Sequence, residues 1–297
     1  MILNASGCLD ALVAPDVARS LDAFVTKTVT PFPRGGNAPV RIAETECGML
    51  NSIGLANPGI DRFVESVLPR LAELGLPIWV SVGGFGAADY ADLCRRLDVR
   101  PEVDTIELNL SCPNVEAPEE TVAGVVAAAR AATGKTLYAK LSPAVPDVAA
   151  AATAAAEAGA DGLSLVNTIR GLALDERTLR PTLSTGSGGY SGPALRPIAL
   201  AAVFAAYAAT RLPIVGMGGV ETGHDAFELI AAGASACALG TVLFADPGAP
   251  SRVRSELAEE AERFGVETPA AARGVAHTIV SSALSFQTKT PAIASEM

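Results

Sequence analysis

The residues best suited to chemistry are the thiol, hydroxyl and two amides of the segment Asn109–Asn114, which reads NLSCPN. The segment follows an apolar strand pattern, Asp104–Leu108, so its polar side chains stand where a strand ends. Taken alone it also has a structural interpretation, in which Cys112 is a small apolar filler and Pro113 ends the strand. Similar polar strand ends along the rest of the chain favour a functional interpretation.

The elements that must position these residues are predicted strands that alternate with predicted helices. Apolar, β-branched runs predict eight strands at Ile2–Ser6, Ala23–Val29, Pro77–Gly83, Thr105–Ser111, Leu137–Ser142, Gly162–Thr168, Pro213–Val220 and Ala236–Val242. Alanine-rich patterns predict helices at Ile60–Leu74, Ala87–Arg96, Glu119–Thr133, Val148–Ala158, Ala194–Thr210, His224–Ala232 and Ala249–Phe264. Buried parallel strands separated by helices are typical of an α/β fold. We therefore expect a single-domain (β/α)8 TIM barrel over residues 1–297.

Two connections are too long to be ordinary loops. Thr30–Gly59 follows the second predicted strand and Ile169–Gly192 follows the sixth, and both are rich in Gly, Pro, Ser and Thr. Long connections in a compact domain usually have a function, so we expect them to cover the active site. The polar residues 278–297 are predicted to be an irregular C-terminal extension.

The composition of the 297-residue chain excludes several classes of protein. A net charge of -10 argues against a nucleic-acid partner. Five scattered cysteines and two histidines predict neither disulfides nor a metal site. The N-terminus does not resemble a signal peptide, and alanine-rich runs such as Val148–Ala158 are shorter than the roughly 20 apolar residues that cross a bilayer. We therefore expect a cytoplasmic protein with no membrane partner.

The carboxyl ends of the predicted strands are polar. Barrel enzymes hold their active sites at this rim. The rim residues are Ser6, Gly7, Lys27, Thr28, Gly83, Gly84, Asn109, Cys112, Lys140, Asn167, Thr168, Gly218, Gly219, Gly240 and Thr241. The glycines that end the seventh and eighth strands favour binding of a phosphate group by backbone N–H groups.

Two lysines and a glycine-rich segment could serve the same site. Lys27 and Lys140 each interrupt an apolar strand pattern, which favours a fixed cation in the barrel mouth over a surface lysine. The segment Gly48–Gly59 offers amides and backbone groups to a flat polar ligand, and it could equally be a loop of Asx turns.

Six ordered motifs resemble the class 1 dihydroorotate dehydrogenases from Asn4 to about Phe264. They are ELNLSCPN, AKLSP, VNTIRG, GGYSGPALRP, GMGGVETGHDAFELIAAGAS and GTVLFADP. The segment RIAETECGMLNSIGLANPG and the form GMGGVE are more similar to the NAD-linked 1B branch than to the fumarate-using 1A branch.

The resemblance implies FMN-dependent oxidation of dihydroorotate to orotate in de novo pyrimidine biosynthesis. Cys112 would be the base that removes a proton from carbon 5, while a hydride leaves carbon 6 for the flavin. The residues implied for FMN are Ser6, Lys27, Thr28, Asn109, Lys140, Val166, Gly192, Gly218, Gly219, Gly240 and Thr241. Those implied for the substrate are Lys27, Asn51, Ser52, Ile53, Gly54, Leu55, Asn109, Asn114, Asn167 and Thr168.

The resemblance also implies a partner subunit, because 1B enzymes pass electrons to NAD through an iron-sulfur and FAD protein. This chain has neither a four-cysteine cluster pattern nor a GxGxxG motif. A homodimer or heterotetramer is therefore expected.

The chain departs from the family in starting at the first barrel strand without the usual N-terminal hairpin. It also has a shorter loop, Val115–Glu119, after Cys112.

Three other functions agree with the same residues. The first is an FMN-dependent enzyme similar to dihydropyrimidine dehydrogenase, although Asn114 stands where an HG pair usually follows SCP. The second is a flavin-free barrel lyase in which Lys140 forms a Schiff base with a phosphorylated carbonyl compound. The third is a non-catalytic paralogue that keeps FMN as a structural ligand.

Overall fold

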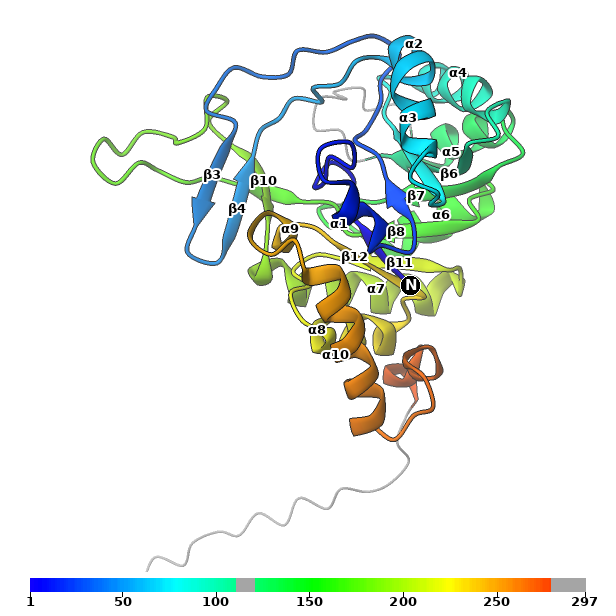
Figure 1. Cartoon of the computed structure of the whole chain (residues 1–297), viewed down its shortest axis with the longest axis vertical. Helices are drawn as coiled ribbons and strands as arrows, with labels where there is room; N and C mark the ends of the chain where they lie inside the picture. The colour runs from blue at the N-terminus through cyan, green and yellow to red at the C-terminus, as the bar shows by residue number, and fades with distance from the viewer. Residues whose placement is uncertain (111–120, 279–297) are drawn as a thin grey trace, which may run out of the picture.

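The computed structural model describes residues 1–110 and 121–278 and contains an eight-stranded parallel barrel (Figure 1). The strands follow the order β1-β12-β11-β8-β7-β6-β5-β2. A bridge between Leu3 and Ala23 joins the first strand in this order to the last. The strands are β1 (Ile2–Asn4), β2 (Phe24–Val25), β5 (Ile78–Val82), β6 (Val103–Asn109), β7 (Thr136–Lys140), β8 (Gly162–Leu165), β11 (Ile214–Met217) and β12 (Ala236–Leu239).

Helices connect these strands and surround the barrel. The main ones are α4 (Ala87–Asp98), α5 (Val122–Arg130), α6 (Val148–Glu157), α7 (Arg196–Thr210), α8 (Gly223–Ala232) and α10 (Ala249–Arg263). Ahead of α4, a π-helical turn (Phe63–Val67) joins α2 (Ile60–Arg62) to α3 (Leu68–Ala72). Shorter elements are α1 (Pro15–Arg19), α9 (Val242–Ala245) and the 3-10 turns Pro193–Leu195, Pro269–Ala272 and Val275–His277.

Local sequence explains where several helices begin. Thr121 accepts a hydrogen bond from the N–H of Gly124 at the start of α5, and Asp147 accepts one from Ala150 at the start of α6. At α8, Thr222 and Asp225 form a reciprocal capping box. Each cap satisfies backbone donors that the first helical turn leaves without partners, which stabilises the helix by about 1 kcal/mol.

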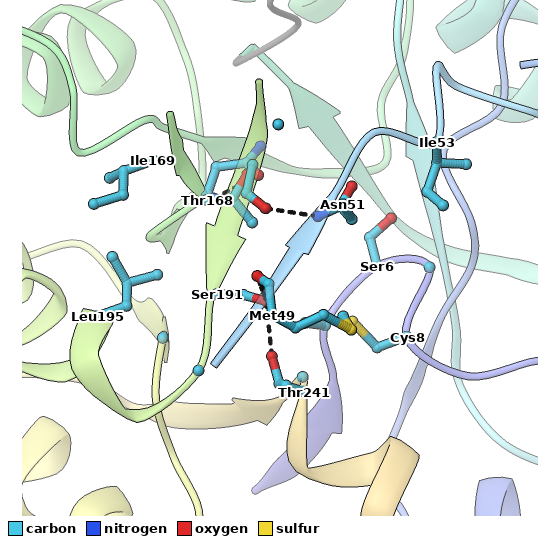
Figure 2. Close-up of a pocket in the computed structure, with 18 of the residues that line it drawn as sticks. Ser6, Cys8, Met49, Asn51, Ile53, Thr168, Ile169, Ser191, Leu195 and Thr241 are labelled. Atoms are coloured by element: carbon cyan, nitrogen blue, oxygen red, sulfur yellow. Dashed lines mark hydrogen bonds between the residues drawn. The ribbon is translucent and has the colours of Figure 1, made fainter. Parts of the chain in front are cut away.

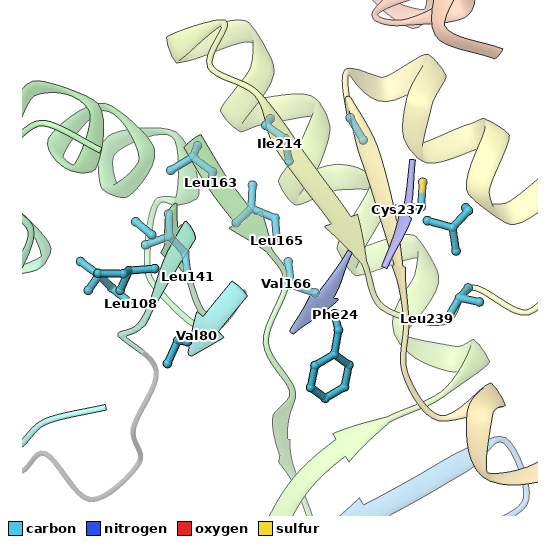
Figure 3. Close-up of a cluster of buried hydrophobic side chains, with 14 of the residues drawn as sticks. Phe24, Val80, Leu108, Leu141, Leu163, Leu165, Val166, Ile214, Cys237 and Leu239 are labelled. Carbon is cyan, nitrogen blue, oxygen red and sulfur yellow. The ribbon is translucent and has the colours of Figure 1, made fainter. Parts of the chain in front are cut away.

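Alternate residues of each strand serve two different cores. On β6, the outward Ile106 and Leu108 join a large apolar layer between strands and helices, part of which appears in Figure 3. Inside the barrel, Trp79 packs against Tyr138 with ring centroids 4.6 Å apart. Glu107 on β6 also points inward. The two-residue period of the strands therefore separates an apolar outer layer from a barrel interior in which a second apolar cluster stands beside polar groups such as Glu107.

All eight predicted barrel strands are present, so the prediction of a (β/α)8 barrel is confirmed. Each strand is shorter than its predicted run except β6, which begins two residues earlier. The predicted helices are also present within the described residues, with ends shifted by a few residues. The extension at 278–297 lies outside the described residues apart from Thr278.

The two long connections contain a second sheet that the sequence analysis did not anticipate. Its strands are β3 (Ile42–Thr45), β4 (Gly48–Asn51), β9 (Ile169–Gly171) and β10 (Gly188–Ser191), in the antiparallel order β3-β4-β10-β9. The sheet lies to one side of the barrel (Figure 1). Leu50 anchors it by packing with Ala43 and Leu183. Short, glycine-rich strands with partners far along the chain carry little local signal, which explains why they were missed.

Among residues 1–110 and 121–278, one helix is long and apolar enough to cross a membrane by length and composition alone. It covers Pro193–Thr210 and includes α7. In this fold, however, α7 contacts α6, α8 and the barrel strand β11, so it forms part of the helical layer around the barrel.

We expect Leu50→Ala to loosen the four-stranded sheet while leaving the barrel folded. Removing this buried side chain should cost about 2–5 kcal/mol locally, because it empties the centre of a small core. Hydrogen exchange should therefore accelerate in β3, β4, β9 and β10. Leu108→Ala, in the barrel's outer core, is the matched control and should instead lower the melting temperature of the whole protein. Equal acceleration across the barrel in Leu50→Ala would contradict this division.

Candidate active site

A cavity of about 650 Å³ lies between the carboxyl ends of the barrel strands and the four-stranded sheet. Residues that follow β1, β8, β11 and β12 form one part of its wall, and residues of β4 and β10 form another. Figure 2 shows Asn51 and Ser6 on one side of this space and Ile169 and Leu195 on the other. The size is within the range of pockets that enclose small molecules and cofactors.

Most of the residues assigned from sequence line this cavity. They are Ser6, Lys27, Asn51, Ser52, Ile53, Gly54, Leu55, Asn109, Lys140, Val166, Asn167, Thr168, Gly192, Gly218, Gly219, Gly240 and Thr241. Cys112 and Asn114 lie outside the described residues. Thr28 does not line the cavity: it is buried one layer below, where its hydroxyl contacts the side chains of Asn109 and Ser6.

A chain of hydrogen bonds fixes the amides at the cavity floor. Asn167 Nδ2 donates to Asn109 Oδ1 at 2.9 Å, and Asn109 Nδ2 donates to Thr28 Oγ1 at 3.1 Å. The Thr28 hydroxyl also lies 3.1 Å from Ser81 Oγ and 3.3 Å from Ser6 Oγ. The Thr168 N–H also donates to Asn167 Oδ1 at 2.9 Å, so both ends of each amide have a partner and the two side chains are held in a fixed orientation beside the cavity.

Polar side chains also connect the two long connections above the cavity. Ser52 and Thr185 approach to 2.6 Å between their hydroxyl oxygens, and Asn37 Nδ2 donates to Ser52 Oγ at 2.9 Å. Asn51 Nδ2 donates to the carbonyl of Gly189 at 3.3 Å. Asn37 and Thr185 line the cavity, and sequence analysis missed both because nothing local marks two loops that meet only in the fold.

Positive charge gathers at the cavity floor. Lys140 is almost completely buried, and its Nζ lies 3.6 Å from Oε1 of Glu107. Lys27 borders the cavity beside Gly7, where a Cβ would approach Lys27 Cδ to 2.8 Å. The absence of a side chain at Gly7 therefore leaves room for this lysine.

A second thiol, Cys8, was not assigned from sequence and also lines the cavity. Burial raises the pKa of the Cys8 thiol, and the charges of Lys140 and Lys27 oppose that rise only in part. The thiol is therefore protonated at neutral pH and unsuited to act as a base.

Backbone donors form a cradle where β11 and β12 end. The N–H groups of Gly218, Gly219, Gly240 and Thr241 donate to no other group among the described residues. Gly218 and Gly219 have φ of 121° and 79°, which favour glycine, and a Cβ at Gly219 would approach the Gly192 carbonyl oxygen to 2.9 Å. Free N–H groups grouped in this way suit an anion such as a phosphate.

Several wall residues were not assigned to the site from sequence, although they lie in segments that the sequence analysis singled out. Met49, Ile169 and Leu195 contribute apolar surface, and Ser191 accepts a 2.8 Å hydrogen bond from Thr241 Oγ1 (Figure 2). The arrangement therefore combines an anion cradle, an apolar wall, fixed amides and buried cations. Such a cavity fits a large planar ligand that carries a phosphate, with a smaller polar molecule beside it.

Comparison with known proteins agrees with this chemistry. The family model described as dihydroorotate dehydrogenase matches residues 1–261. The dihydroorotate dehydrogenase B (NAD(+)) catalytic subunit of Desulforudis audaxviator is 45% identical over 265 residues, covering 86% of each chain. A putative dihydroorotate dehydrogenase A (fumarate) of Solibacter usitatus is 44% identical over 254 residues, covering 83% of this chain and 84% of its own.

A solved structure shows the same fold. The dihydroorotate dehydrogenase of Eimeria tenella in complex with ferulenol superposes with a TM-score of 0.79 at 24% identity, covering 94% of this chain and 85% of its own. The relative from Geobacter sulfurreducens, also named a B (NAD(+)) catalytic subunit, is 44% identical over 245 residues and covers 80% of each chain. The chain belongs to the dihydroorotate dehydrogenase family, and relatives at 44–45% identity that are named as NAD-linked B catalytic subunits support its place in the 1B class.

Proposed function

We propose that this chain oxidises dihydroorotate to orotate in pyrimidine biosynthesis, with FMN as its flavin. The family is flavin-dependent, and the choice of FMN rests on the cradle of N–H donors at Gly218, Gly219, Gly240 and Thr241, which have no acceptor within the described part of the chain. A single phosphate matches four donors at one place. The apolar wall beyond the cradle is suited to the flat face of the isoalloxazine ring.

FMN supplies the acceptor for the hydride that leaves carbon 6 of the substrate. Gly192 and Ser191 border the cradle, and Lys140 lies at the floor where the ring would rest. A buried ammonium group there favours negative charge on the ring system, which helps the ring to accept electrons.

The substrate is proposed to bind beside the ring, among the fixed amides. Asn51, Asn109 and Asn167 both donate and accept, which matches the urea-like edge of a dihydropyrimidine. Lys27 is a suitable partner for the substrate carboxylate. Cys112 is proposed to take the proton from carbon 5, a role that requires the thiolate form of its side chain.

The relatives' name, catalytic subunit, implies that this chain works with a partner subunit in electron transfer. We propose that the partner carries an iron-sulfur cluster and FAD and passes electrons to NAD, and that the complex is cytoplasmic. Co-purification of such a flavoprotein from native cells would test this proposal.

Purification of the protein tests the main proposal. It should be yellow with near-stoichiometric FMN, and anaerobic dihydroorotate should bleach the flavin absorbance. Colourless protein that takes up no FMN would favour the Schiff-base lyase. Bleaching by dihydrouracil but not by dihydroorotate would favour the dihydropyrimidine alternative, and flavin that neither compound reduces would favour a non-catalytic paralogue.

Cys112→Ala should retain FMN but lose most of the dihydroorotate-dependent bleaching, because the base is removed without disturbing the cradle. Cys112→Ser should react slowly, since a hydroxyl is a poorer base than a thiolate. Stopped-flow reduction measures both rates. Cys47→Ala, at an exposed cysteine, is the control and should bleach at the wild-type rate. Unchanged bleaching in Cys112→Ala would contradict the assignment of the base.

Asn167→Ala should lower kcat/KM for dihydroorotate by about tenfold to a hundredfold. The substitution removes one proposed substrate contact, and it also removes the hydrogen bond that Asn109 Oδ1 accepts from Asn167. FMN content should stay near that of the wild type because the cradle is untouched. Steady-state kinetics with an artificial acceptor and the flavin spectrum measure the two quantities. Thr153→Ala on α6 is the control, and equal losses in both variants would indicate a general effect on folding.

A further inference from the structure

Glu107 is a buried carboxylate to which neither the fold nor the proposed reaction assigns a role. Its side chain is 1% exposed, and that of its partner Lys140 is 7% exposed. Among the ion pairs of the described residues, this is the one in which both side chains are more than nine-tenths buried. It stands in the barrel interior, directly below the cavity floor.

Burying these two charges costs free energy that their contact offsets poorly. Their separation of 3.6 Å is too long for a hydrogen bond, and Glu107 Oε1 has no other hydrogen-bond partner among the described residues. Ser164, beside Lys140 on the neighbouring strand, also has a buried hydroxyl oxygen without a partner. Replacing a buried ion pair by apolar residues is often neutral or stabilising, so stability does not explain why these charges are here.

The position of the pair indicates a role at the cavity instead. In the register of β6 and β7, Glu107 lies opposite Tyr138 while Asn109 lies opposite Lys140. The carboxylate is therefore one layer below the amide and ammonium groups that face the cavity. Lys27 adds a second ammonium, and both lysines act on the thiol of Cys8. Two like charges near one another increase the cost of keeping each one protonated.

We propose that Glu107 is a positioning residue that holds the ammonium group of Lys140 at the cavity floor, where its charge raises the reduction potential of the flavin. This inference depends on the proposed binding of a flavin in the cavity. Without its buried partner, the Lys140 side chain has no carboxylate to hold its charge at this place, so the ammonium group moves away from the floor. Loss of Glu107 should therefore lower the reduction potential of the flavin, as loss of Lys140 itself should.

The experiment measures the midpoint potential of the flavin in the holoenzyme against reference dyes. Glu107→Gln keeps the size of the side chain and removes its charge. At the wild-type midpoint potential, we expect its ratio of reduced to oxidised flavin to fall about tenfold, which is about 30 mV for a two-electron couple. Lys140→Gln should lower the ratio by a similar factor. The double variant should match Lys140→Gln, because Glu107 acts through Lys140.

Glu102→Gln is the matched control. It makes the same substitution just ahead of the opposite end of β6, where Glu102 pairs with Arg100 at 2.9 Å, and it should leave the potential unchanged. If Glu107→Gln does not fold or retain flavin, Glu107→Asp replaces it. The shorter carboxylate stays farther from Lys140, so a smaller fall in the same direction is expected.

An unchanged or higher potential in Glu107→Gln, or in Glu107→Asp where that variant replaces it, would overturn the proposal. A further fall in the Lys140→Gln background would also overturn it, since Glu107 would then act without Lys140. These potentials need bound flavin but no turnover. If dihydroorotate does not reduce wild-type flavin, the proposed function fails while the role of Glu107 is still measured. Wild-type protein that binds no flavin overturns both.

Discussion

The closure of eight parallel strands into one ring is the constraint on which the rest of this structure depends. All strands then end at the same rim, so residues far apart in sequence, such as Ser6 and Thr241, line one cavity. The two-residue period of each strand separates residues that pack against the helices from residues that face the barrel interior. The packing that holds the helices on the barrel therefore also fixes the direction of Asn109 and Lys140.

Charged groups inside the barrel interact strongly with their neighbours because they are buried away from water. Cations that would be weakly felt at a surface act strongly on nearby groups in a dry interior. The Cys8 thiol shows both effects, since burial raises its pKa and two lysines oppose the rise. At the cavity floor, Glu107 and Lys140 are likewise buried, and each lies near the opposite charge of the other. The amide chain from Asn167 to Thr28 adds fixed dipoles without adding net charge.

Features that depend on residues close together in the sequence could be predicted, whereas features that depend on residues far apart in the sequence could not. Strand and helix periodicity is local, so the barrel was predicted correctly, and most of the residues assigned to its rim line the cavity. The pairing of β4 with β10 joins residues such as Asn51 and Gly189 that are 138 positions apart, and no local pattern marks it. Glu107 was visible within the strand pattern, but its proposed role depends on its contact with Lys140 of the neighbouring strand, which appears only in the fold. Cys112 was assigned from a motif and lies outside the described residues.

The cavity is built from two parts whose stability has different origins. Asn109 and Asn167 belong to the barrel, where strand pairing and a large apolar core hold them. Asn51 belongs to the small antiparallel sheet, whose core is little more than Leu50 with Ala43 and Leu183. Contacts such as that between Ser52 and Thr185 hold this sheet together above the rim. A ligand that touches Asn51 and Asn109 together would join the two parts, so binding itself should stabilise the weaker one.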